Sequence, residues 1–263
     1  MRELLQTAIE ASIKSGKEIL KIYSTDFEVV SKDDDSPLTM ADKNANDVIN
    51  TFLEPTGIPI ISEENKQADY NVRKEWDTCW IVDPLDGTKE FIKRNGEFTV
   101  NIALVKNGSP VLGVIYVPVS KSLYFTAADG SSAYKIEIES EDQFDVAEIL
   151  KNASIIGPSS IPNKIRVVGS RSHLNEATQS FIDQLPTQNE VEIVSKGSSL
   201  KFCLVAEGAA DVYPRFAPTM EWDTAAGHAI CQAAGVKVID QNTQKPMQYN
   251  KENLLNAYFL VTK

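Results

Sequence analysis

Apolar residues follow helical spacing over the first part of the chain. Between Leu5 and Tyr23 they recur every three or four positions, the period of an amphipathic helix. After a polar segment that ends at Pro37, residues 39–53 continue in the same way until Pro55 stops them. Two helices are therefore expected before residue 55.

The pattern then changes to short apolar runs typical of strands. They lie at residues 58–61, 79–82, 100–105, 111–117 and 123–127. Asn107 and Gly108 separate two of these runs, and Asn-Gly between apolar segments is a strong hairpin signal. An antiparallel sheet is expected here.

Residues 131–160 are polar and carry little periodic signal, which indicates a domain junction. Beyond them, strands expected at 165–169, 191–194, 211–213 and 236–239 alternate with helices expected at 175–185, 200–207 and 223–234. Alternation of this kind indicates an α/β arrangement. We expect an N-terminal half at 1–158 with the antiparallel sheet, and a C-terminal α/β half at 159–263 whose last strand is 236–239.

Composition restricts the function classes. A formal charge of −11 over 263 residues argues against a partner that is a nucleic acid polymer, because such binding needs a broad Lys/Arg surface. Three cysteines without a CxxC pair favour a reducing compartment. No signal peptide pattern and no apolar run of about 18 residues that could span a membrane occurs. A cytoplasmic protein is expected.

The strand expected at 79–82 ends in Asp83-Pro84-Leu85-Asp86-Gly87-Thr88. Pro84 and Gly87 force a turn that brings Asp86 back beside Asp83. Two carboxylates on such a turn can share divalent ions, the Leu85 carbonyl can add an oxygen, and hard oxygen ligands favour Mg²⁺. A helix beginning near Thr88 would offer N–H groups that suit a phosphate oxygen.

Three further acids could complete this site. Glu63 follows the strand at 58–61, as Asp83 follows its own strand, while Asp42 lies near a helix start and Asp223 precedes an Ala-rich helix. Each also has an ordinary explanation. Glu63 can be surface charge, Asp42 can favour a helix dipole, and Asp223 can cap a helix.

The segments Ser62-Glu63-Glu64, Asp83 to Thr88 and Trp222 to Ala226 occur in this order. Together they resemble the inositol monophosphatase superfamily of Mg²⁺-dependent, lithium-sensitive phosphomonoesterases, which carries an SEE- or GEE-type acid pair, a DPxDGT core and a WDxAA element. The resemblance implies an α/β fold (α+β by some schemes), a layered αβαβα sandwich with the catalytic cleft between its two halves.

The resemblance also implies the roles of the acidic residues. Glu63, Asp83 and the Leu85 carbonyl would hold one Mg²⁺, and Asp83, Asp86 and Asp223 a second, with a third, weaker ion in parts of the family. Asp42 and Thr88 would orient or deprotonate the attacking water. Because Thr88 is a poor base by itself, we expect it to position the water and to act as a relay to Asp42.

Within the superfamily the chain is most similar to the CysQ-type 3′(2′),5′-bisphosphate nucleotidases, through the segments 169–173, 197–203 and 206–215. This similarity implies that the substrate contacts Gly87 and Thr88 together with Glu63, Leu85, Asp86 and Asp223 of the metal site. The nucleotide loops would add Ser170, His173, Gly197, Lys201 and Arg215, with Lys201 and Arg215 on the non-scissile 5′-phosphate. Taken alone, His173 suits a turn, Lys201 a solvated helix face and Arg215 a surface ion pair.

The implied reaction is the hydrolysis of 3′-phosphoadenosine 5′-phosphate (PAP) to AMP and phosphate in sulfur metabolism, with 3′-phosphoadenylyl sulfate (PAPS) as a second substrate. One alternative is a phosphatase of the same superfamily acting on inositol phosphate or another sugar phosphate. Another is a catalytically silent PAP sensor, although every expected metal ligand is present. The resemblance leaves open a monomer or a homodimer, and a loose association with the inner face of the membrane.

Overall fold

The computed structural model describes residues 1–25, 37–169, 175–186 and 188–263. The two helices expected at the start are α1 (Arg2–Tyr23) and α2 (Pro37–Leu53), and the short η1 (Glu54–Thr56) contains the Pro55 expected to end α2. The remaining helices are α3 (Tyr70–Arg73), α4 (Thr88–Ile92), α5 (Val146–Asn152), α6 (Glu176–Asp183), α7 (Leu200–Ala206) and α8 (Ala225–Ala233).

The first sheet has seven strands in chain order: β1 (Ile60–Ser62), β2 (Thr78–Asp86), β3 (Thr99–Lys106), β4 (Ser109–Val117), β5 (Ser122–Thr126), β6 (Ala133–Glu137) and β7 (Ser154–Ile156). Only the β1–β2 pair is parallel. The expected hairpin joins β3 to β4, and both Asn107 (φ 49°) and Gly108 (φ 74°) have the positive φ that such a turn requires.

The second sheet has the order β11-β12-β10-β8-β9. Its strands are β8 (Lys164–Val168), β9 (Glu190–Val194), β10 (Val212–Arg215), β11 (Lys237–Asp240) and β12 (Phe259–Thr262). The sequence predicted that the strand at 236–239 would be the last one. The structure instead has a further strand, β12, which inserts between β10 and β11 and pairs antiparallel with both. The segment 131–160 also contains β6, α5 and β7, which its polar composition concealed.

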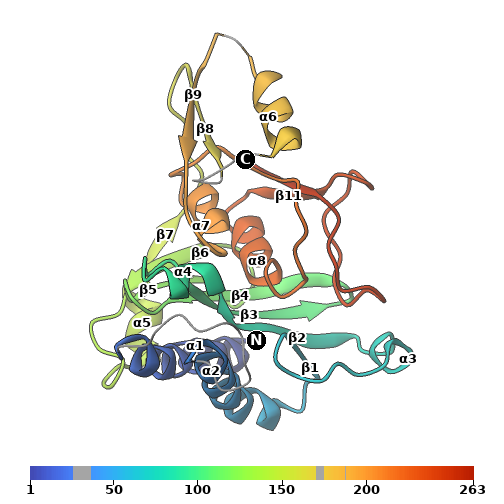
Figure 1. Cartoon of the computed structure of the whole chain (residues 1–263). Helices are drawn as coiled ribbons and strands as arrows, with labels where there is room; N and C mark the ends of the chain where they lie inside the picture. Colours follow the sequence, from blue (N-terminus) through green and yellow to red (C-terminus); the bar gives the residue numbers. More distant parts are fainter. Residues whose placement is uncertain (26–36, 170–174, 187) are drawn as a thin grey trace.

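Five layers follow from the packing, and Figure 1 shows them from α1 and α2 to α6. Helices α1 and α2 cover one face of the first sheet, and α8 lies against its other face. Helices α7 and α8 lie between the two sheets, and α6 packs on β10. The layered αβαβα arrangement expected from the sequence is confirmed. No helix among the described residues is both long and apolar enough to cross a membrane.

Two hydrophobic clusters fill the spaces between these layers. One lies between α1, α2 and the first sheet and includes Trp80, Phe91 and Phe98. The other joins residues of both sheets, for example Ile81 and Phe259, around α7 and α8. Because the second cluster belongs to both halves, the halves share a core, and the boundary at residue 158 stays a prediction.

Helix α8 approaches the first sheet closely because β4 carries a glycine there. A Cβ atom on Gly113 would lie 2.4 Å from the Ala226 carbonyl oxygen and 2.8 Å from the Ala229 Cβ. Small residues on both elements therefore set the height of α8 above the sheet.

Gly113→Ala should lower the free energy of unfolding by about 2 kcal/mol, because an added methyl group overpacks this contact. Gly157→Ala is the matched control, since its Cβ would meet nothing within 4 Å; it should change stability by less than about 0.5 kcal/mol. Urea unfolding of both variants measures the difference, and equal stabilities would contradict the close-contact explanation.

Candidate active site

A bulge at the end of β2 turns two carboxylates to the same side. In the pairing of β2 with β3, Asp83 is opposite Asn101 and Asp86 is opposite Thr99, so three steps on β2 match two on β3. Side chains three apart in a regular strand point to opposite faces, and the extra residue corrects this. The Leu85 N–H donates to Asp83 Oδ1 at 3.0 Å and fixes the turn.

Gly87 allows the chain to leave this turn and start α4. It has φ +104°, and a Cβ there would lie 2.2 Å from Ser198 Oγ. Both the backbone conformation and the contact with the loop at 197–199 therefore require glycine. Thr88 is the first residue of α4, as the sequence predicted.

Carboxylates from both halves of the chain meet at Asp83. Glu63 comes from the end of β1, Asp223 from the segment before α8, and ligand atoms of Glu63, Asp83 and Asp223 lie within 4.8 Å of one another. Burial and the negative charges of Asp86, Glu63, Asp223 and Asp42 raise the pKa of Asp83 well above its ordinary value. This cluster favours a bound cation, which would compensate the repulsion.

Asp86 and Asp223 respond to the same crowding. Burial and the charge of Asp223 raise the pKa of Asp86 to about 7, against the opposing effects of Lys201 and of hydrogen bonds from Ser199 and Asn101. Burial raises the pKa of Asp223 to about 6, although the Met220 N–H donates to its Oδ2 at 2.8 Å. Among the described residues, the positive charges of Lys201 and Arg215 therefore do not offset the effects that raise the pKa of these two carboxyls.

A buried polar network that sequence reasoning missed holds Asp86. The Asn101 side-chain amide donates to Asp86 Oδ2 at 3.4 Å, and its Oδ1 accepts from Thr99 (3.1 Å) and Ser199 (2.7 Å). Ser198 Oγ donates to the Asp86 carbonyl at 2.5 Å. The available signal was a lone asparagine within the apolar run of β3.

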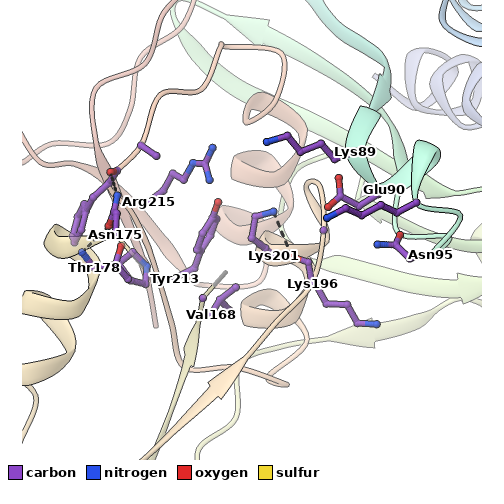
Figure 2. A pocket seen from close by; sticks show the side chains of 16 residues that line it. Lys89, Glu90, Asn95, Val168, Asn175, Thr178, Lys196, Lys201, Tyr213 and Arg215 are labelled. Carbon is purple, nitrogen blue, oxygen red and sulfur yellow. Dashed lines mark hydrogen bonds between the residues drawn. The ribbon is translucent and has the colours of Figure 1, made fainter. Parts of the chain in front are cut away.

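A cavity of about 490 Å³ lies between α4 on one side and β10 and α6 on the other, as Figure 2 shows. Its lining includes five cations and one acid: Lys89, Lys93, Lys196, Lys201, Arg215 and Glu90. The cavity adjoins the carboxylates, since Lys201 acts electrostatically on Asp86 and Arg215 on Asp223. An acidic protein therefore has a locally basic cavity.

Lys201 and Arg215 retain capacity for an anion. The Lys201 ammonium has a 3.5 Å contact with the Lys196 carbonyl, and burial lowers the pKa of its amine. Arg215 donates to the Pro218 carbonyl through Nη2 at 3.0 Å, while its buried Nε makes no hydrogen bond to any residue that the structure describes. A buried donor without a partner is costly, so Arg215 favours an acceptor from a ligand.

The other predicted residues are placed as follows. Asp42 lies buried on α2, which contacts α4 and therefore the element that carries Thr88. Gly197 lines the cavity, but its N–H donates to Glu97 Oε2 at 2.8 Å, so the loop is held by an acid from the first half. Ser170 and His173 lie outside the described residues. His228, Cys79 and Cys203 are buried.

Comparison with known proteins identifies the family. The model of the inositol monophosphatase family matches residues 1–260 of this chain. The chain belongs to the inositol monophosphatase family.

Relatives within this family are similar over nearly the whole chain. The 3′(2′),5′-bisphosphate nucleotidase CysQ of Salmonella typhimurium is 45% identical, covering 98% of this chain and 99% of the relative. CysQ of Escherichia coli K12 is 44% identical with the same coverage. The crystal structure of CysQ from Bacteroides thetaiotaomicron matches with a TM-score of 0.89 and 52% identity, over 97% of this chain and 95% of that one. The expected similarity to the CysQ-type subfamily is confirmed.

The raised carboxylate pKa values predict how pH affects the metal-free protein. A carboxyl with a pKa of about 7 when folded and 3.8 ordinarily binds a proton in the folded state that the unfolded state has released. The free energy of unfolding should therefore fall as the pH rises from about 4 to about 7. Asp86→Asn should flatten this dependence, which urea unfolding in EDTA measures. Identical pH dependence in both proteins would contradict the charge crowding.

Proposed function

We propose that this protein is a Mg²⁺-dependent 3′(2′),5′-bisphosphate nucleotidase that hydrolyses PAP to AMP and phosphate. The observation that carries the proposal is the acidic cluster around the buried Asp83, beside a cavity lined by five cations. One region suits the scissile phosphate with its metal ions, and the other suits a second phosphate. The similar proteins named 3′(2′),5′-bisphosphate nucleotidase CysQ support this substrate class.

The acidic residues present fit Mg²⁺. Carboxylate and carbonyl oxygens are its preferred ligands, and a bound cation would relieve the repulsion that raises the pKa of Asp83. Glu63, Asp83 and the Leu85 carbonyl would hold one ion, and Asp83, Asp86 and Asp223 a second. Bound Mg²⁺ would polarise the phosphoryl group and neutralise charge on the leaving oxygen.

Asp42 and Thr88 prepare the water. The Thr88 hydroxyl oxygen accepts a hydrogen bond from the attacking water, and its own proton is directed to the Asp42 carboxylate. The charge of Asp42 reaches the cluster, where it contributes to the raised pKa of Asp83. The water oxygen forms the new bond to phosphorus as the ester P–O bond breaks. The proton given up by the water passes through Thr88 to Asp42 and from there to solvent, and the leaving 3′-oxygen takes up a proton from solvent.

Lys201 and Arg215 bind the 5′-phosphate. Both line the cavity next to the carboxylates, and the Nε of Arg215, which has no partner in the described part of the chain, can donate to a phosphate oxygen. Charge-assisted hydrogen bonds of this kind are among the strongest available to a protein. The same cations suit PAPS, whose 5′-phosphate carries a sulfate.

The alternative functions need less than the cavity provides. An inositol monophosphate has one phosphate, which the acidic site would take, and it offers no second phosphate to Lys201 and Arg215. A silent PAP sensor would not need the complete set Glu63, Asp83, Asp86, Thr88 and Asp223. The three buried free cysteines support a cytoplasmic, reducing environment. As a separate proposal, we place the boundary between the N-terminal and C-terminal halves at residue 158.

Asp83→Asn should abolish phosphate release from PAP with Mg²⁺, because it removes a charge shared by both proposed ions. The fold should survive, and stability in EDTA should be at least that of the wild type, since the change also removes repulsion. Phosphate release and near-ultraviolet circular dichroism measure these effects. Wild-type turnover by the variant would exclude the proposed metal site.

Lys201→Ala should raise the KM for PAP by about 10-fold or more, because a hydrogen bond to a charged group contributes about 1.5–3 kcal/mol. It should change the KM for adenosine 3′-phosphate, which lacks the 5′-phosphate, by less than about twofold. Lys151→Ala, which removes an exposed lysine paired with Glu148 on α5, is the control. Equal losses on both substrates would remove Lys201 from the 5′-phosphate.

A further inference from the structure

Glu221 lies two residues before the proposed metal ligand Asp223 and is completely buried, with 0% of its surface exposed. Its carboxylate accepts hydrogen bonds from the backbone N–H groups of Asn250 (2.6 Å) and Lys251 (3.0 Å). The Lys251 ammonium also donates to it at 2.5 Å. A buried carboxylate with three such donors has a fixed position.

The turn that carries Asp223 is held on its other side by Asn256. The Asn256 side-chain amide donates to the Met220 carbonyl at 2.7 Å and to Thr224 Oγ1 at 3.0 Å. Its backbone N–H donates to the Thr219 carbonyl at 2.8 Å. The conformation of residues 219–224 therefore depends on the C-terminal segment 250–256.

The same C-terminal segment is bound to the half of the chain that carries Glu63. Arg73, buried at the end of α3, donates to Asn250 Oδ1 at 2.8 Å and to the carbonyls of Lys251 (3.1 Å) and Glu252 (3.2 Å). The Asn250 amide donates in return to the Arg73 carbonyl at 2.7 Å. Figure 1 shows the C-terminal segment after β11 descending toward α3.

Arg73 also reaches back toward the metal cluster. Its Nε donates to the Ala68 carbonyl at 3.1 Å, within the segment that follows Glu63. In the same segment, the Gln67 side-chain amide donates to the Ser62 carbonyl, next to Glu63. A continuous path of hydrogen bonds and short chain segments thus joins Glu63 to Asp223 without passing through either carboxylate.

We propose that the bridge Arg73–Asn250–Lys251–Glu221 is a positioning device that sets the separation of Glu63 and Asp223, which would ligate the two neighbouring ions held in common by Asp83. The inference rests on the proposed function, since it takes these two acids as metal ligands. Neither Glu221 nor Lys251 contacts the substrate in this account. They act by holding the turn of Asp223 against the half that carries Glu63, because metal ligands need outer partners to keep their geometry.

A second ion pair with a buried carboxylate, in the same half of the chain, provides a comparison. Lys263 pairs with the buried Asp211, which also accepts from Arg166, and the Lys263 side chain is 34% exposed, as is that of Lys251. Asp211 precedes β10 and has no bond to the turn of Asp223 among those described. Removing either lysine leaves the buried carboxylate with other donors, which are Arg166 for Asp211 and backbone N–H groups for Glu221. Because only Asp211 keeps a cation, Lys251→Met should cost more stability, and Mg²⁺ binding is compared at a temperature where both variants are folded.

The test uses Lys251→Met and Lys263→Met in the full-length protein, with Mg²⁺ binding measured by calorimetry in the absence of nucleotide. Lys251→Met should weaken Mg²⁺ binding by about 10-fold or more, the usual cost of losing an outer partner of a metal ligand. Its KM for PAP at saturating Mg²⁺ should change by less than about twofold, and Lys251→Arg should restore Mg²⁺ affinity. Lys263→Met should bind Mg²⁺ like the wild type.

Asn250→Gly is a second variant that interrupts the bridge, and it removes no charged group. Asn250 has φ +59°, which glycine tolerates, so the variant removes only the side-chain link to Arg73. It should also weaken Mg²⁺ binding by severalfold. Wild-type Mg²⁺ affinity in both Lys251→Met and Asn250→Gly, or an equal loss in Lys263→Met, would overturn the positioning role. A wild-type protein that binds no Mg²⁺ would instead overturn the proposed function.

Discussion

Carboxylates from two halves of the chain repel one another around the buried Asp83. Asp83 lies among Asp86, Glu63, Asp223 and Asp42, and their combined charge and burial raise its pKa. Such an arrangement costs free energy and persists only where the surrounding structure imposes it. The bulge of β2, the glycine at 87 and the network around Asn101 supply that constraint.

The layered fold brings the acidic cluster and the basic cavity together. The first sheet contributes the ends of β1 and β2, and the region between the sheets contributes Asp223, Lys201 and Arg215. Helix α8 can approach the first sheet because Gly113 has no side chain, so the segment before it delivers Asp223 to Asp83. Negative and positive regions thus lie side by side, a distribution suited to a substrate with two phosphates that need different partners.

Much of this arrangement could be predicted from the sequence, because the decisive signals are local. Helical periodicity gave α1 and α2, Asn107-Gly108 gave the hairpin, and the motif around Asp83 gave the turn and the start of α4. The strand β12 could not be placed in this way, since its pairing partners lie far away in the chain. For the same reason Asn101 and Glu221 were missed, because their partners are supplied only by tertiary structure.

The most direct test is phosphate release, with Mg²⁺, from PAP, inositol 1-phosphate and fructose 1,6-bisphosphate under identical conditions, with and without lithium. The account predicts a strong preference for PAP in kcat/KM, because only PAP places a second phosphate on an adenosine next to Lys201 and Arg215. It also predicts inhibition by lithium, as the resemblance to the lithium-sensitive phosphomonoesterases implies. A preference for either sugar phosphate would contradict the role given to the basic cavity. Absence of release from all three would contradict the account of the acidic cluster as a catalytic metal site.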